Sequence, residues 1–124
     1  MRFLAAAILL LLLAASPAWA CTMPAGGFVA GSLAVTPQPA PLPVNAPFAL
    51  AIAPCGAVPQ ALAVDATMPA HRHGMNYRPA VTKTGDGFRA DGLLFHMPGD
   101  WEFVFDVTHA DGRRERLTHT VTVQ

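Results

Sequence analysis

Apolar and polar residues alternate with a period of two along much of the chain, most clearly between residues 101 and 109. In a β-strand, successive side chains point to opposite faces, so alternation of this kind predicts a strand with one buried face. The expected inward face of this strand consists of Trp101, Phe103, Phe105 and Val107. Its other face carries mainly Glu102, Asp106 and Thr108.

Weaker versions of this pattern recur between turn signals such as "GDG" and "ADG". No segment shows helical periodicity. The further strands expected from the pattern are 28–35, 48–52, 61–67, 81–84, 88–90, 93–96 and 114–123. About seven or eight short strands in about 100 residues predict an all-β fold, an immunoglobulin-like antiparallel β-sandwich. A cupredoxin-like sandwich remains the alternative, because the pattern does not contain the strand order.

The N-terminus has the features of a secretory signal peptide. A positive charge at Arg2 precedes a continuous apolar run over residues 3–15, and Ala18 and Ala20 provide a small-x-small cleavage site. A bilayer span needs roughly 18–20 apolar residues, which is more than this run supplies. We therefore expect residues 1–20 to be removed, leaving 21–124 as a single domain. The mature chain is expected to be periplasmic and soluble, without a transmembrane segment.

Two cysteines, Cys21 and Cys55, leave two interpretations open. An oxidising compartment permits a disulfide between them, which would attach the mature N-terminus to the sandwich. Alternatively, Cys21 directly follows the cleavage site and could carry a lipid anchor. Ala18 and Trp19 fit a lipoprotein signal poorly, so the disulfide is the favoured interpretation.

Charge and motif content argue against two broad classes of function. Lys and Arg number 8, as do Asp and Glu, and loss of Arg2 with the signal peptide leaves the mature chain near −1. A nucleic-acid-binding domain would show a clustered basic excess. The sequence also lacks a nucleophile–base pair, paired carboxylates at a plausible site and a glycine-rich phosphate loop. We expect neither nucleic-acid binding nor an enzyme.

The segment "MPAHRHGMNYRP" (68–79) contains the most distinctive chemistry. His71, His73 and Met75 are spaced two residues apart, so an extended backbone would point all three to one side. Met68 lies across the Pro69 bend and can reach the same point. Imidazole nitrogens with thioether sulfurs suit copper, Cu(I) especially, and suit Mg²⁺ or Ca²⁺ poorly.

A second group of soft donors occurs in "LLFHMPGDW", where His96 and Met97 are adjacent. Asp65 precedes the first segment and is a candidate for a side chain that orients a metal-binding histidine through a hydrogen bond, without binding the metal itself. The opposing interpretation is a polar loop with no metal, in which methionines fill gaps in the core and His96 bonds to the backbone.

Together these two segments resemble the YtkA-like/FixH-like family of small secreted or membrane-tethered β-sandwich domains. The resemblance covers about residues 65–107, through "MPAHRHGMNYRP" and "GDGFRADGLLFHMPGDWEFVFDV". The residues that match its motifs are Met68, His71, His73, Met75, His96, Met97 and Trp101. The resemblance implies an immunoglobulin-like fold and a link to copper handling or respiratory-oxidase assembly.

The sequence therefore predicts a periplasmic copper-binding domain that holds Cu(I) through a His/Met loop, for copper delivery or tolerance. Its expected partners are the copper ion and a periplasmic metalloprotein or oxidase-assembly protein. The alternative is a metal-free secreted β-sandwich, in which the same loop serves as a partner-binding surface.

Overall fold

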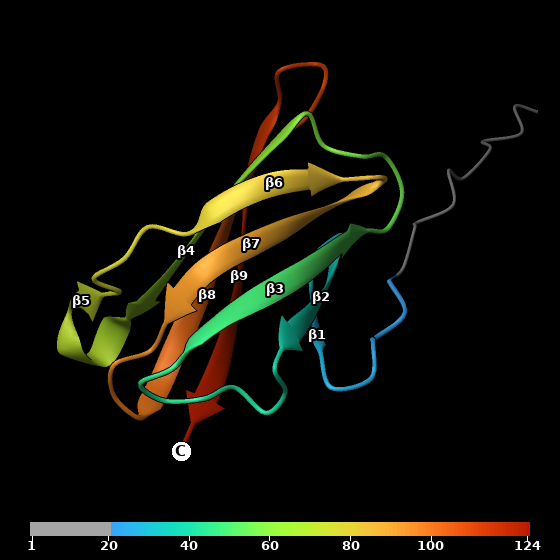
Figure 1. Cartoon of the computed structure of the whole chain (residues 1–124). Helices are drawn as coiled ribbons and strands as arrows, with labels where there is room; N and C mark the ends of the chain where they lie inside the picture. The colour runs from blue at the N-terminus through green and yellow to red at the C-terminus, as the bar shows by residue number, and fades with distance from the viewer. Residues whose placement is uncertain (1–20) are drawn as a thin grey trace, which may run out of the picture.

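The computed structural model describes residues 21–124, so the expected signal peptide, 1–20, lies outside the described residues. Two antiparallel sheets pack face to face (Figure 1). The first sheet contains, in spatial order, β1 (Phe28–Ala30), β2 (Leu33–Gln38), β3 (Pro47–Pro54), β7 (Gly87–Leu94) and β6 (Ala80–Thr84). The second contains β5 (His73–Gly74), β4 (Ala61–Met68), β8 (Gly99–Thr108) and β9 (Arg114–Val123).

The prediction of an all-β antiparallel sandwich is confirmed. The order β2-β3-β7-β6 opposite β5-β4-β8-β9 corresponds to strands A-B-E-D opposite C′-C-F-G of an immunoglobulin-like fold. Several strand boundaries differ from the expected ones: β3 and β8 are longer, and the short strand β5 was not expected. A turn at Gly31, with φ of 54°, divides 28–35 into β1 and β2. Conversely, the expected strand 88–90 and the first half of the expected strand 93–96 form the single strand β7, where a register shift near Gly92 (φ 79°) replaces the expected break. Phe95 and His96 follow the end of β7 and belong to the connection to β8.

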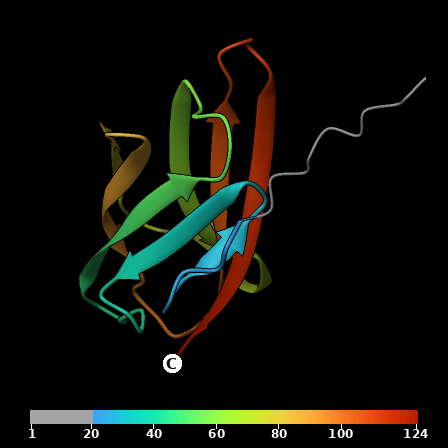
Figure 2. The same ribbon diagram turned by 90° about the vertical axis from the view of Figure 1, so that its right-hand side faces the viewer.

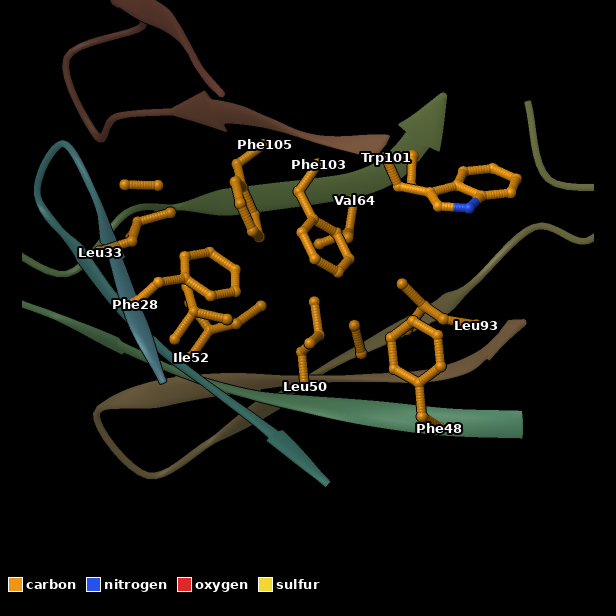
Figure 3. Packing of buried hydrophobic residues seen from close by; sticks show 14 of the residues in the cluster. Phe28, Leu33, Phe48, Leu50, Ile52, Val64, Leu93, Trp101, Phe103 and Phe105 are labelled. Carbon is orange, nitrogen blue, oxygen red and sulfur yellow. The ribbon is translucent and has the colours of Figure 1, made fainter. Parts of the chain in front are cut away.

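The core lies between the sheets and is dominated by the inward face of β8. Trp101, Phe103, Phe105 and Val107 are all buried, as the alternation predicts. Phe103 lies near the middle of the cluster, with its ring centroid 5.4 Å from that of Phe28 and 5.6 Å from that of Phe95. In Figure 3, Trp101 stands at the end of the row formed by Phe105 and Phe103. The indole of Trp101 is therefore the part of the core that lies at one end of the sandwich.

The predicted disulfide between Cys21 and Cys55 is confirmed, with the two Cα atoms 5.3 Å apart. Cys55 also donates its backbone N–H to the carbonyl of Ser32 at 2.8 Å. These bonds attach the start of the described chain to the first sheet. Within residues 21–124, no helix is long and apolar enough to cross a membrane.

The two segments that carry the histidines and methionines meet at one end of the sandwich. From β4 the chain enters a 3₁₀ turn, η1 (Pro69–His71), and returns as β5. The connection from β7 to β8, which contains His96 and Met97, lies at the same end (Figure 1). At the side of the sandwich where β1 lies beside β9 (Figure 2), the ring of Phe28 stacks on that of His119 at 4.2 Å.

Candidate metal centre

The backbone between Met68 and His73 turns sharply and does not stay extended. Pro69 occupies the first turn of η1, where its fixed φ is favourable and its missing N–H costs little. Arg72 then adopts a left-handed conformation, with φ of 54°, and reverses the chain. His73 becomes the cross-strand neighbour of Met68. This differs from the extended backbone expected for the loop, because the proline favours a turn.

Three imidazole rings nevertheless lie side by side. The centroids of His71 and His73 are 5.7 Å apart, with 21° between the ring planes. His96 approaches from the β7–β8 connection, and its ring centroid is 5.2 Å from that of His73. His73 is thus the middle member of the row, and its two neighbours come from different segments of the chain.

The indole of Trp101 packs against two of these rings. Its centroid is 5.4 Å from that of His96 and 6.2 Å from that of His73, and both imidazoles are steeply inclined to it. Phe95 stacks on the indole at 4.5 Å, and the indole N–H donates to the carbonyl of Met97 at 3.0 Å. The sequence predicted Trp101 as a core residue, and the pattern did not reveal its contact with the histidines. The short spacing between His96 and Trp101 is the signal that could have suggested it.

His96 also carries a buried polar atom without a partner. Its Nδ1 is the one buried side-chain nitrogen or oxygen in residues 21–124 that makes no hydrogen bond. Leaving such a group unsatisfied costs roughly 1–3 kcal/mol, so an atom of this kind requires a physical explanation. A metal ion or a bound donor would satisfy it.

The donor set suits a metal by chemical type, although its atoms are not already gathered around one point. Imidazole nitrogen is a good ligand for copper and zinc, and ligation needs distances of about 2.0–2.1 Å for zinc. No group of three or more His, Cys, Asp or Glu side chains in the described part of the chain is arranged to hold an ion. His71 and His73 are exposed, so their rings can turn toward an ion without disturbing the core. Binding would therefore require these side chains to rearrange.

The methionines Met68, Met75 and Met97 are more buried than His71 and His73, whereas His96 is half-buried like Met75 and Met97. Met68 is only 1% exposed and belongs to the hydrophobic cluster between the sheets. Met75 and Met97 are half-buried and pack against the same cluster. In this conformation the exposed donors are the imidazoles of His71 and His73, and thioether ligation by Met75 or Met97 would require their side chains to turn outward.

Asp65 lies on the outward face of β4, opposite to the face that buries Met68. Its Oδ1 accepts a hydrogen bond from the backbone N–H of Ala66 at 2.8 Å. It also lines an open groove together with Met75 and Tyr77. The expected role in orienting a histidine stays a prediction, and the observed contact is with the local backbone.

In comparisons with known proteins, no family model, no curated protein and no solved structure matches this chain. Its function must therefore be argued from its own residues.

Proposed function

We propose that this chain is a copper-binding immunoglobulin-like domain that acts outside the cytoplasm and holds Cu(I) at the end of the sandwich that carries η1 and β5. The proposed primary ligands are His71, His73 and His96. The observation that carries the proposal is the row of three neighbouring imidazoles, one with a buried nitrogen that lacks a partner. The Cys21–Cys55 disulfide supports an oxidising compartment.

Copper is preferred over other metals because of the donors within reach. Met75 follows His73 by two residues and Met97 follows His96 directly. Both thioethers are half-buried beside the core, and a soft sulfur would reach the ion if either side chain turned outward. Nitrogen with thioether sulfur favours copper and disfavours Mg²⁺ and Ca²⁺. The resemblance to the YtkA-like/FixH-like family agrees with this choice.

Exposure of the site supports copper delivery or tolerance as the biological role. His71 and His73 lie on the surface. Ligands of a receiving protein could approach the ion from that side, whereas His96 retains it from the buried side. The receiving partner would be a periplasmic metalloprotein or an oxidase under assembly.

Competition with a chromophoric Cu(I) chelator tests the proposal. The oxidised mature protein, residues 21–124, should remove about one Cu(I) per chain, and His71→Ala with His73→Ala should abolish removal. His109→Ala is the matched control, because this histidine contacts Glu115 at 3.3 Å, beyond the end of β8 opposite Trp101. A chelator spectrum that the wild-type protein leaves unchanged would refute copper binding.

Intrinsic fluorescence provides an independent assay. The chain contains two tryptophans, of which Trp19 belongs to the expected signal peptide. In the mature chain Trp101 is therefore the one indole, and it lies against His73 and His96. Copper at these rings should quench its emission, and the double histidine variant should remove the quenching.

A metal-free interaction domain is the second candidate, and one observation favours it. Tyr77 is 55% exposed on the same loop as the histidines. Exposed tyrosine is enriched at protein interfaces because it combines an apolar ring with a polar hydroxyl. Failure of both copper assays would leave this function as the better explanation.

A further inference from the structure

We infer that Trp101 and Met68 are positioning residues that hold His96 against His73, and that Met68 acts as a spacer and not as a metal ligand. The consequence for copper affinity rests on the proposed function. The geometric part concerns the metal-free protein and can be tested without copper.

Trp101 fixes the turn that carries His96. Its indole is fully buried and stacks on Phe95 at 4.5 Å, so the ring has little freedom to move. From this fixed position the indole N–H donates to the carbonyl of Met97, the residue directly after His96. The hydrogen bond closes the chain between Met97 and Trp101, and the indole also contacts the imidazole of His96. One side chain thus contacts the ring of His96 and holds the backbone of the next residue.

Met68 joins the other segment to the same turn. Directly opposed residues of neighbouring strands project to the same face, and Met68 is opposite His73. The Met68 side chain is buried, and its Cε lies only 2.7 Å from the position that a Cβ on Gly99 would occupy. Met68 therefore lies between the strand of His73 and the turn after His96, and its apolar side chain fills the space between them.

The glycine of the turn provides its backbone conformation and leaves room for the end of Met68. Gly99 has φ of 130°, a conformation that residues with a side chain rarely adopt. A Cβ there would also lie 2.7 Å from the Met68 Cε, so the end of that side chain would have to move aside. Gly99 belongs to the "MPG" sequence of the turn, and Met68 begins "MPAHRHGM". Both residues thus serve the contact between the two segments that carry the histidines.

This arrangement divides the three histidines into two kinds. His73 and His96 form a pair held by Met68 and Trp101. His71 belongs to the exposed turn η1, in which no residue is buried. The fixed pair would receive the ion first, and His71 would complete the site.

Trp101→Phe is the central test, because it keeps an aromatic ring but removes the indole N–H. Phe105→Leu is the matched control, since Phe105 is equally buried on the same face of β8 but lies farther along the strand from the site. The first measurement is the nuclear Overhauser effect between the imidazole protons of His73 and His96 in the metal-free protein. The second is Cu(I) affinity by chelator competition, below the unfolding temperature of each variant.

We expect Trp101→Phe to weaken the His73–His96 Overhauser effect and to lower Cu(I) affinity about 10- to 100-fold, as for other changes behind metal ligands. Phe105→Leu should lower the melting temperature and leave both measurements unchanged. Met68→Leu keeps a long apolar side chain without the sulfur, so it should preserve both. If Trp101→Phe does not fold, Gly99→Ala disturbs the same turn from the other side and should weaken the Overhauser effect.

Each other outcome has a defined meaning. Unchanged Overhauser effect and affinity in Trp101→Phe would show that Trp101 is only a core residue and would overturn the inference. Loss of copper by Met68→Leu with an intact Overhauser effect would show that Met68 is a ligand, overturning its role as a spacer. If wild type binds no copper, the proposed function fails, and the Overhauser comparison still decides the positioning role.

Discussion

Replacing both cysteines, in Cys21→Ser/Cys55→Ser, should destabilise the mature protein strongly through its unfolded state. The disulfide joins residues separated by 34 positions. In the chain-entropy model, closing a loop of this length removes unfolded-state entropy worth about 4 kcal/mol at 25 °C. Domains of this size have a total unfolding free energy of roughly 5–15 kcal/mol. The bond therefore provides a large share of the stability.

Urea unfolding followed by Trp101 fluorescence measures this effect. With an m-value of about 1.5 kcal/mol per molar urea, the loss corresponds to a decrease in midpoint of about 2–3 M. Wild-type protein kept reduced should unfold at the same midpoint as the double variant, because both lack the same constraint. Intact mass before unfolding verifies that the oxidised sample has lost two hydrogens, and it would also detect a lipid on Cys21.

The reasoning would be refuted if the double variant unfolded within about 0.5 M urea of the oxidised wild type. That result would mean that the segment joining the cysteines is already restricted in the unfolded chain. A shift in the reduced wild type but not in the double variant would instead indicate that free thiols, and not the missing bond, cause the loss.

Three further predictions follow from the core, the second sheet and the candidate site. Phe103→Ala should lower the free energy of unfolding by about 3–5 kcal/mol, because it empties the space between Phe28 and Phe95. Val104 is a half-buried neighbour, and Val104→Ala should lower the free energy of unfolding less in the same urea experiment. Burial lowers the pKa of His119 below its usual 6.5. The unfolded chain therefore takes up this proton at a higher pH than the folded chain does. The free energy of unfolding should decrease as the pH falls through 6.5 toward the pKa of the folded state. His119→Gln should therefore lose less stability than wild type between about pH 7 and 5, and parallel pH profiles would contradict this. At the candidate site, His73→Ala should weaken Cu(I) binding more than His71→Ala in chelator competition, because His73 is the middle ring of the row; equal losses would show that the ion does not depend on this order.

The types of metal-binding side chain at the candidate site could be predicted from the sequence, but the set of residues that come together there could not. The types of donor and the two segments that carry them are local features, visible in "MPAHRHGM" and "FHMPGDW". The contact of His96 with His73 depends on how β4 and β8 pair and on where the β7–β8 connection crosses. The burial of Met68 likewise depends on which face of β4 turns inward. The spacing of residues within one segment of the sequence reveals neither this contact nor this burial.

The sequence by itself determined that this chain forms strands, because alternation of apolar and polar residues is a local property that only an extended backbone can satisfy with one buried face. It also determined which residues of β8 face inward, and it permitted the pairing of its two cysteines. The order of the strands, the convergence of three imidazoles and the indole beneath them were decided only by tertiary structure. Contacts between segments far apart in the chain arise when two sheets close over a shared core, and no local pattern encodes that geometry.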